Sequence, residues 1–268
     1  MPNETKPLTL PQLLEKDTVK KRFVEILDKN ASGFIQSLLT IYNSSDSLKK
    51  CDARSILAAA GLAATLNLSI SPSLGHAYIV PYGGKAQFQI GWKGLVQLAH
   101  QTGKYVALHS GVVYEGQIRD IDCITGELIR GEKISDEVVG YVAYMKLANG
   151  FEKSLYMTRA EMEEHAMKFS QTYQSDKQKK WSTWAKFFDK MACKTVLKLL
   201  LSRWGILNSD LATAIQADQS EVTKTTFTYI DNDGKTVERD SIFELDEPQT
   251  VDAPFEEIID AETGEVIK

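Results

Sequence analysis

The chain lacks the features that mark several common classes of protein. Its 268 residues include three cysteines, at positions 51, 123 and 193, and no two of them have the Cys-x-x-Cys spacing. Neither a disulfide framework nor a zinc site is therefore expected. The apolar run at residues 56–64 is far shorter than the roughly 20 residues of a membrane span. The start, Met-Pro-Asn-Glu-Thr-Lys, has no apolar signal core, so we expect a cytoplasmic protein with no membrane partner.

Motifs of catalysis are also missing. The sequence has no Gly-x-x-x-x-Gly-Lys-Ser/Thr phosphate loop, so chemistry driven by ATP is not supported. Its four histidines show no ligand spacing such as His-Glu-x-x-His. We therefore expect no catalytic residue, no metal ligand and no required cofactor, and we interpret the protein as a non-enzyme.

The charge is unevenly distributed along the chain. Residues 209–268 carry sixteen acidic and four basic side chains, a balance of −12, although the whole chain has a net charge of −5. The preceding residues therefore carry +7, so a basic body is joined to an acidic tail. The tail has too few apolar residues to offset its chain entropy, and we expect it to be disordered.

Periodicity predicts an α+β fold with N-terminal helices, a central antiparallel hairpin or sheet packed with helices, and the disordered acidic tail. Asp52 is a predicted helix N-cap, and Thr158 with Glu161 fits a capping box. We divide the chain into residues 1–70, 71–217 and 218–268. The expected elements of the middle part are strands at 76–81, 86–90, 105–114, 127–129, 138–147 and 153–157, helices at 92–102, 158–168, 182–204 and 211–217, and a mobile polar loop at 171–180.

The hairpin is the most informative segment. Gln87 and Gln89 alternate with apolar residues, so the two amides share one face. Lys85, Trp92 and Lys93 surround this face, and the combination suits a ligand with phosphates and flat bases. Residues 91–94, Gly-Trp-Lys-Gly, copy the Gly-x-x-Gly loop that clamps a nucleic-acid backbone in KH domains. The same glycines are equally compatible with a tight crossing from strand to helix.

A second basic feature lies in the predicted helix 182–204. Lys186, Lys190, Lys194 and Lys198 recur every four residues, which on a helix produces a stripe with about 6 Å between successive lysines along the axis. Only Asp189 interrupts these cations, whereas a solvated helix face usually mixes both signs of charge. Most charge runs are nonetheless solvated faces, and the residues alone leave that alternative open. Arg159 and Arg203 add positive charge nearby in sequence.

Aromatic side chains provide candidates for base stacking. One or two of them are expected to stack, because most tryptophans of amphipathic helices belong to a core. The candidates are Tyr78, Tyr82, Phe88, Trp92, Trp181 and Trp184.

Two of these segments resemble known sequences. Residues 74–82, Leu-Gly-His-Ala-Tyr-Ile-Val-Pro-Tyr, and 87–94, Gln-Phe-Gln-Ile-Gly-Trp-Lys-Gly, resemble the central signature of the RecT family of phage single-strand annealing proteins. Residues 181–207 resemble the basic helix of that family, with its Met-Ala-x-Lys-Thr core. Weaker similarity covers about four fifths of the chain, from residue 10 to 217, and excludes the tail.

This resemblance implies ATP-independent binding of single-stranded DNA and annealing of complementary strands in phage-type recombination, inside a bacterial host cell. It implies a homo-oligomer, either a ring or a helical filament, with subunit contacts in residues 1–70. Single-stranded DNA and nascent duplex are the expected ligands, with Mg²⁺ entering only through the DNA. A phage exonuclease and the host single-strand binding protein are expected partners, contacted through the C-terminal tail.

Two other functions are compatible with the residues. A passive single-strand binding protein would have the same composition but would not accelerate duplex formation. A metal-dependent nuclease would need carboxylates around a hard cation. The carboxylates that could serve are Glu115, Asp120, Asp122 and Glu127.

Overall fold

The computed structural model of the chain describes residues 8–218 and five short segments beyond them, 220–222, 226–229, 236–238, 258–259 and 266–267. It contains helices and exclusively antiparallel strand pairs in these residues, so the predicted α+β class is confirmed. None of the helices described has the length and apolar character needed to cross a membrane.

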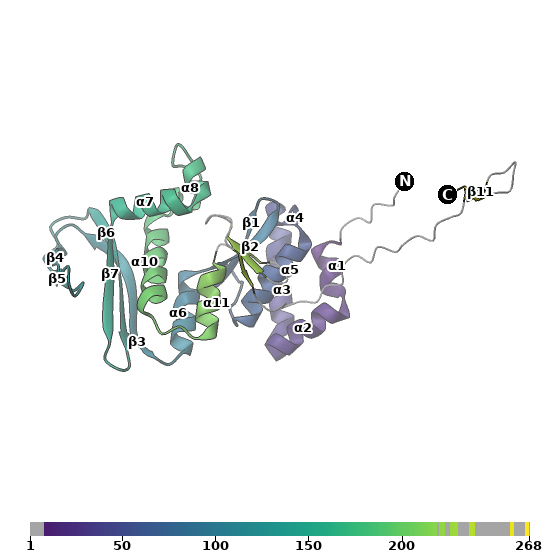
Figure 1. Cartoon of the computed structure of the whole chain (residues 1–268), viewed down its shortest axis with the longest axis horizontal. Helices are drawn as coiled ribbons and strands as arrows, with labels where there is room; N and C mark the ends of the chain where they lie inside the picture. Colours follow the sequence, from purple (N-terminus) through teal and green to yellow (C-terminus); the bar gives the residue numbers. More distant parts are fainter. Residues whose placement is uncertain are drawn as a thin grey trace.

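The N-terminal part folds as helices around an alanine-rich centre (Figure 1). They are α1 (Leu10–Glu15), α2 (Asp17–Leu27), the 3-10 turn Asp28–Asn30, α3 (Ala31–Ser44), α4 (Asp46–Lys49) and α5 (Ala53–Thr65). α5 is buried along most of its length, because its small side chains permit close packing. Asp52 caps α5 as predicted, since its carboxylate accepts the backbone N–H of Arg54 at 3.2 Å.

The predicted hairpin packs on these helices. Strands β1 (Ala77–Tyr82) and β2 (Lys85–Ile90) are paired so that Tyr82 lies opposite Lys85. Gly83 and Gly84 have φ values of 55° and 81°, which their two-residue turn requires. Phe88 and Ile90 are fully buried in the core that also contains α5. The helical region and the hairpin therefore share one apolar core.

The chain after Asp218 adds strands to this hairpin, which differs from the disordered tail predicted. β8 (Ser220–Val222) pairs antiparallel with β2, and β9 (Thr226–Tyr229) and β10 (Thr236–Glu238) extend the sheet. An unpaired edge of β2 offers backbone hydrogen bonds to any extended segment, whatever its charge, which explains the difference. β11 (Ile258–Ile259) pairs separately with β12 (Val266–Ile267). The rest of the predicted tail lies outside the described residues.

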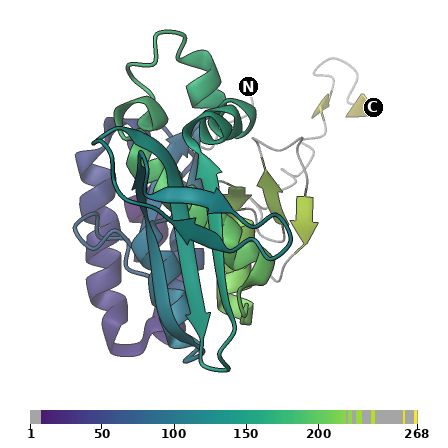
Figure 2. The same ribbon diagram turned by 90° about the vertical axis from the view of Figure 1, so that its left-hand side faces the viewer.

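A second sheet forms the other side of the molecule. β3 (Tyr105–Tyr114), β6 (Val138–Leu147) and β7 (Glu152–Thr158) form it in the order β3-β6-β7. The hairpin of β4 (Ile118–Ile121) and β5 (Leu128–Arg130) lies across its outer face (Figure 2). The long helix α10 (Phe188–Trp204) packs on the opposite face (Figure 1). α6 (Trp92–Gln101) and α11 (Ser209–Ala217) join this half to the hairpin β1–β2.

The region between the second sheet and α10 departs from the sequence analysis in two places. α7 (Arg159–Phe169) begins with the predicted capping box of Thr158 and Glu161. The polar loop that follows, expected to be mobile, begins with the short helix α8 (Gln171–Ser175). The predicted helix 182–204 is divided into α9 (Thr183–Lys186) and α10, because Phe187 leaves helical geometry with φ −135° and ψ 45°. Lys186 therefore lies on a different helix from the other three lysines of the expected stripe.

The glycines of the Gly-x-x-Gly segment have a packing role. Neither Gly91 nor Gly94 has a positive φ. A Cβ on Gly91 would lie 2.0 Å from the carbonyl oxygen of Gly75, and a Cβ on Gly94 would lie 2.2 Å from that of His76. Both glycines are thus needed for the start of α6 to cross the chain that enters β1.

We predict that Gly94→Ala lowers the free energy of unfolding by about 1–3 kcal/mol, because the backbone around His76 must move to accept the new Cβ. Urea unfolding followed by circular dichroism measures this change. Gly33→Ala is the matched control, since a Cβ at that helical position meets nothing within 4 Å, and a gain of up to about 1 kcal/mol is expected there. Equal stability of Gly94→Ala and the wild type would contradict the packing role.

Candidate nucleic-acid interface

A buried charge cluster joins α10 to the end of α11. The carboxylate of Asp218 accepts hydrogen bonds from Lys194 Nζ at 3.1 Å and from Lys198 Nζ at 2.8 Å. It also accepts the backbone N–H of Ile90 at 3.1 Å, which ties the end of β2 to the same group. The Asp218 side chain is 1% exposed, and those of Lys194 and Lys198 are 11% and 25% exposed.

The electrostatics of this cluster keep Asp218 ionised. Burial raises the pKa of its carboxyl, but the charges and hydrogen bonds of Lys194 and Lys198 outweigh burial and hold the pKa below its ordinary value. The two ammonium groups are thus paired with a buried carboxylate and are largely shielded from solvent.

Three of the predicted DNA-binding residues, Lys194, Lys198 and Gln87, are largely buried, whereas the sequence analysis assumed that they are exposed. Lys194 and Lys198 turn toward Asp218, a partner that the spacing of lysines could not reveal. Gln87 is only 3% exposed, and its Nε2 atom has no hydrogen-bond partner in the described part of the chain. The strand period that assigned Gln87 to a polar face is correct, but this face is covered at Gln87.

The remaining lysines of the predicted stripe are exposed at the start of α10. No ion pair involving Lys186 or Lys190 occurs among the residues that the structure describes. Lys190 Nζ lies 5.4 Å from the centre of the Phe187 ring, which is itself 52% exposed. Asp189, the one acid between them, is engaged by Arg159 at 3.7 Å and accepts the Tyr141 hydroxyl at 2.6 Å. Its charge is thus partly balanced within the protein.

The turn of the hairpin lies beside this region. The Tyr82 hydroxyl donates a hydrogen bond to Gln171 of α8, and Lys85, opposite Tyr82 in the hairpin, is exposed. α8 in turn contacts α9, which carries Lys186. The hairpin turn is therefore linked to α8 by a hydrogen bond, and α8 to α9 by direct contact. We group the exposed lysines of these linked elements, Lys85, Lys186 and Lys190, under the name hairpin–α9 surface.

The other predicted residues lie in different places. Trp92 (50% exposed) and Lys93 are at the start of α6, at the opposite end of β2 from Lys85. Gln89 is half-buried in β2 between them. Arg203 is exposed near the last turn of α10, beside the Trp204 ring at 5.8 Å. Of the predicted residues, Lys85, Lys186 and Lys190 thus lie on elements that are linked through α8, and Arg159 is paired with Asp189 of α10. The others lie elsewhere.

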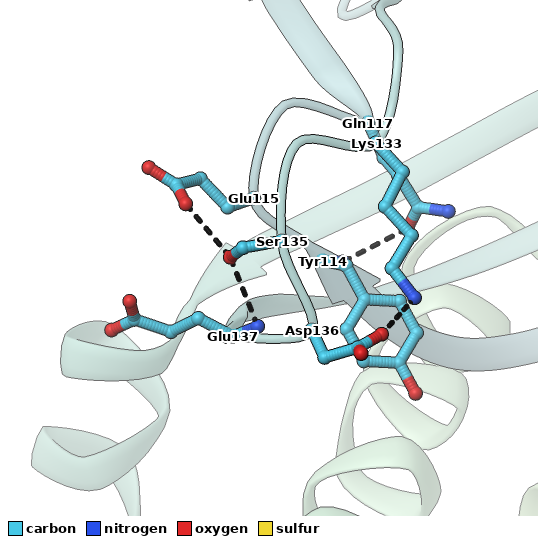
Figure 3. Close-up of polar contacts among 7 residues, drawn as sticks. All are labelled: Tyr114, Glu115, Gln117, Lys133, Ser135, Asp136 and Glu137. Carbon is cyan, nitrogen blue, oxygen red and sulfur yellow. Dashed lines mark hydrogen bonds and ion pairs between the residues drawn. The ribbon is translucent and has the colours of Figure 1, made fainter.

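Three of the four carboxylates considered for a hard cation, Glu115, Asp120 and Asp122, accept hydrogen bonds within the protein. Figure 3 shows that Glu115 accepts a hydrogen bond from Ser135 Oγ, at 2.8 Å. Asp122 accepts the backbone N–H groups of Ile124 and Thr125 in the β4–β5 turn. Among the described residues, no group of three or more His, Cys, Asp or Glu side chains is arranged to hold a metal ion.

A small cavity of about 30 Å³ lies beside the buried charge cluster, with room for about one water molecule. Lys194, Lys198, Asp218 and His165 are among its lining residues. Burial lowers the pKa of His165 to about 4, and the positive charges of Lys198 and Lys168 act in the same direction. His165 is therefore neutral at pH 7 and adds no further positive charge to the cavity.

We predict that Asp218→Asn lowers the free energy of unfolding at neutral pH by about 3–5 kcal/mol, because two largely buried ammonium groups lose their counter-charge. Urea unfolding at pH 7 measures the loss. The contribution of Asp218 is present above the carboxyl pKa of the unfolded chain, about 3.9, and is lost as pH falls through the lower pKa of the folded state. Asp46→Asn, which breaks an exposed pair with Lys49, is the control and should change stability little. Equal effects of the two variants would contradict the structural role of Asp218.

The lowered pKa of His165 predicts that stability also depends on pH in a higher range than that of Asp218. Its ordinary pKa of 6.5 falls to about 4 in the folded state, so between these values the unfolded chain binds a proton that the folded chain does not. Wild-type stability should therefore decrease as pH falls from about 6.5 toward about 4. In His165→Gln this decrease should be smaller. Thermal unfolding of both proteins across this range tests the expectation, and parallel curves would contradict it.

Comparison with known proteins identifies the family. The family model described as RecT family matches residues 32–231. A Bacillus subtilis (strain 168) protein named "Uncharacterized protein YqaK" is 45% identical over 217 residues, which cover 80% of this chain and 74% of that protein. "Protein RecT" of Escherichia coli (strain K12) is 24% identical over 221 residues, covering 78% of this chain and 79% of that protein. The resemblance predicted from the two sequence blocks is confirmed, and the chain belongs to the RecT family, whose members act in DNA recombination by single-strand annealing.

Proposed function

We propose that this protein binds single-stranded DNA and anneals complementary strands without ATP. The observation that carries this proposal is the family match, which extends over about three quarters of the chain and includes both the hairpin β1–β2 and α10. The absence of a phosphate-loop motif from the sequence is consistent with annealing that consumes no nucleotide. DNA-bound Mg²⁺ is the only metal ion we include in the proposal.

The energetics of annealing require little chemistry from the protein. Base stacking contributes about 1.4 kcal/mol per base-pair step, so pairing itself drives the reaction. The protein has to reduce the repulsion between two phosphate backbones and hold one strand so that the other can test its register. Exposed ammonium groups perform the first task, because they replace the counterions of the DNA.

The hairpin–α9 surface is the part of the structure that best fits this task. Lys186 and Lys190 are exposed beside an exposed aromatic ring, Phe187, and the one neighbouring acid is engaged by Arg159. Trp92 and Lys93 form a second exposed pair at the start of α6, where backbone N–H groups and the helix dipole favour a phosphate. Of these two sites, we propose that the hairpin–α9 surface is the main contact for the DNA strand.

Assembly and partners belong to the same proposal. Homo-oligomers, as rings or helical filaments, would place many such surfaces along one strand, with subunit contacts from the helices α1 to α5. An exonuclease that generates single strands and a host single-strand binding protein remain proposed partners of the acidic tail, most of which lies outside the described residues.

Annealing of two complementary oligonucleotides, one carrying a fluorophore and the other a quencher, tests the proposal directly. Without nucleotide triphosphate, the protein should accelerate duplex formation over the uncatalysed rate. Protection of the strands without acceleration would indicate a passive binding protein and overturn the proposal. Shortened strands after incubation with Mg²⁺ would indicate a nuclease and overturn it as well.

We predict that Lys186→Ala combined with Lys190→Ala weakens binding to single strands of any sequence. The slope of log affinity against log salt concentration should fall by about 0.7 for each phosphate that the variant no longer neutralises. Fluorescence anisotropy titrations at several salt concentrations measure this slope. Lys104→Ala is the matched control, since Lys104 is exposed beside the far end of the second sheet from α7. An unchanged slope in the double variant would exclude this surface from the DNA interface.

A further inference from the structure

The loop between α8 and α9 is organised by one buried carboxylate. Asp176 is fully buried, and its carboxylate accepts backbone N–H groups from Lys180 at 3.0 Å, Trp181 at 2.8 Å and Ser182 at 2.8 Å. Burial raises the pKa of Asp176, but these hydrogen bonds outweigh burial and lower the pKa to about 2. The carboxylate is therefore ionised at neutral pH and accepts all three bonds at full strength.

Lys179 fixes the loop from its other side. It has a φ of 52°, in the left-handed region, and its backbone N–H bonds to the carbonyl of Asp176 at 2.9 Å. Its ammonium group donates to the carbonyl of Tyr173 at 2.7 Å and lies 3.6 Å from the centre of the Tyr173 ring. Tyr173 is buried against Trp184 and Phe188, so this lysine anchors the loop to the core.

The loop presents two lysines and a tryptophan outward. Lys177 and Lys180 are exposed, and Trp181 is 55% exposed. Within the described residues, neither ammonium group forms an ion pair or hydrogen bond, and the indole contacts no other ring. The Trp181 indole is thus half-exposed beside two cations, on a backbone held by a buried acid, and it is not part of the apolar core of the described residues.

We propose that this loop is a contact site for single-stranded nucleic acid, in which Trp181 stacks on a base, Lys177 and Lys180 bind the adjacent phosphates, and Asp176 is the positioning residue. The inference deepens the proposed function and rests on it. The loop is continuous with the hairpin–α9 surface, because the backbone N–H of Lys186 bonds to the carbonyl of Ser182 at 3.0 Å.

The chemistry of the site favours a single strand over a duplex. A base that stacks on an indole uses its flat face and leaves its Watson–Crick edge free for a second strand. The inner bases of a formed duplex have no free face, so the indole would lose its partner when pairing is complete. Because the loop is already ordered, binding does not have to supply the entropy cost of ordering it.

Trp181→Ala gives the first test, in the full-length protein. It should weaken binding to a single-stranded oligonucleotide by about tenfold or more, as expected for one base-stacking contact, while Trp181→Phe should retain most of the affinity. Binding to a blunt duplex should change much less. Quenching of tryptophan fluorescence on addition of single strands should also be smaller in Trp181→Phe than in the wild type. Equal affinities of the wild type and Trp181→Ala for single strands would overturn the proposal.

Lys177→Ala combined with Lys180→Ala gives the second test. The salt slope for single strands should fall by about 1.4, since about 0.7 is expected for each phosphate contact on a single strand. Lys104→Ala should leave the slope unchanged. A double variant with the wild-type slope would overturn the assignment of the two lysines.

Asp176→Asn tests whether Asp176 affects DNA binding by positioning the loop or by stabilising the whole protein. It should weaken single-strand binding in the otherwise wild-type protein, but it should have little further effect on binding when Trp181, Lys177 and Lys180 are all replaced by alanine. Its effect on thermal unfolding should be the same in both backgrounds. Equal losses of binding in both backgrounds would show that Asp176 acts only through general stability. Failure of the wild-type protein to anneal strands would count against the proposed function, whereas normal annealing with an unaffected Trp181→Ala variant would count against this inference alone.

Discussion

The contact between Asp218 and the two lysines of α10 determines how the two halves of the molecule are joined. The carboxylate is bonded to Lys194 and Lys198 of α10, follows α11, and accepts the N–H of Ile90 in β2. A buried charge is costly unless it is paired and hydrogen-bonded, so each of these elements is fixed relative to the others by a group that must keep all of its partners. The Asp218 carboxylate thereby sets the relative positions of β2 and α10, which carry Lys85 and Lys190 of the hairpin–α9 surface.

The same contact divides the lysines of one sequence run into two kinds. Lys194 and Lys198 are largely buried and compensate Asp218, whereas Lys186 and Lys190 are exposed near the start of α10. The break at Phe187 increases the separation, because it places Lys186 on a short helix of its own. Of the four regularly spaced cations, two therefore stabilise the fold and two are available to a polyanion.

Features that depend on residues close together in sequence could be predicted, whereas those that depend on residues far apart could not. The capping box at Thr158 and the N-cap at Asp52 were predicted correctly, because each depends on residues within a few positions. Asp218 lies 20 and 24 residues from its lysines and 128 residues from Ile90, so no local pattern reveals that it neutralises them. The break at Phe187 involves neither proline nor glycine, the usual signals of a helix end. The three hydrogen bonds from the loop after α8 to Asp176 were not predicted either, because the polar composition of this loop does not indicate which side chain is buried.

Two buried acids, Asp218 and Asp176, have opposite effects on the number of cations left exposed. Asp218 draws two ammonium groups into the protein, whereas Asp176 accepts three backbone N–H groups and pairs with neither Lys177 nor Lys180 among the described residues. A protein that anneals strands has to release the duplex it forms, and each additional phosphate contact would strengthen the binding of product as well as substrate. Stacking differs from charge in this respect, because it is available to an unpaired base and is lost within a duplex. On the proposed function, the exposed indole therefore contributes to the binding of unpaired bases and not to that of the completed duplex.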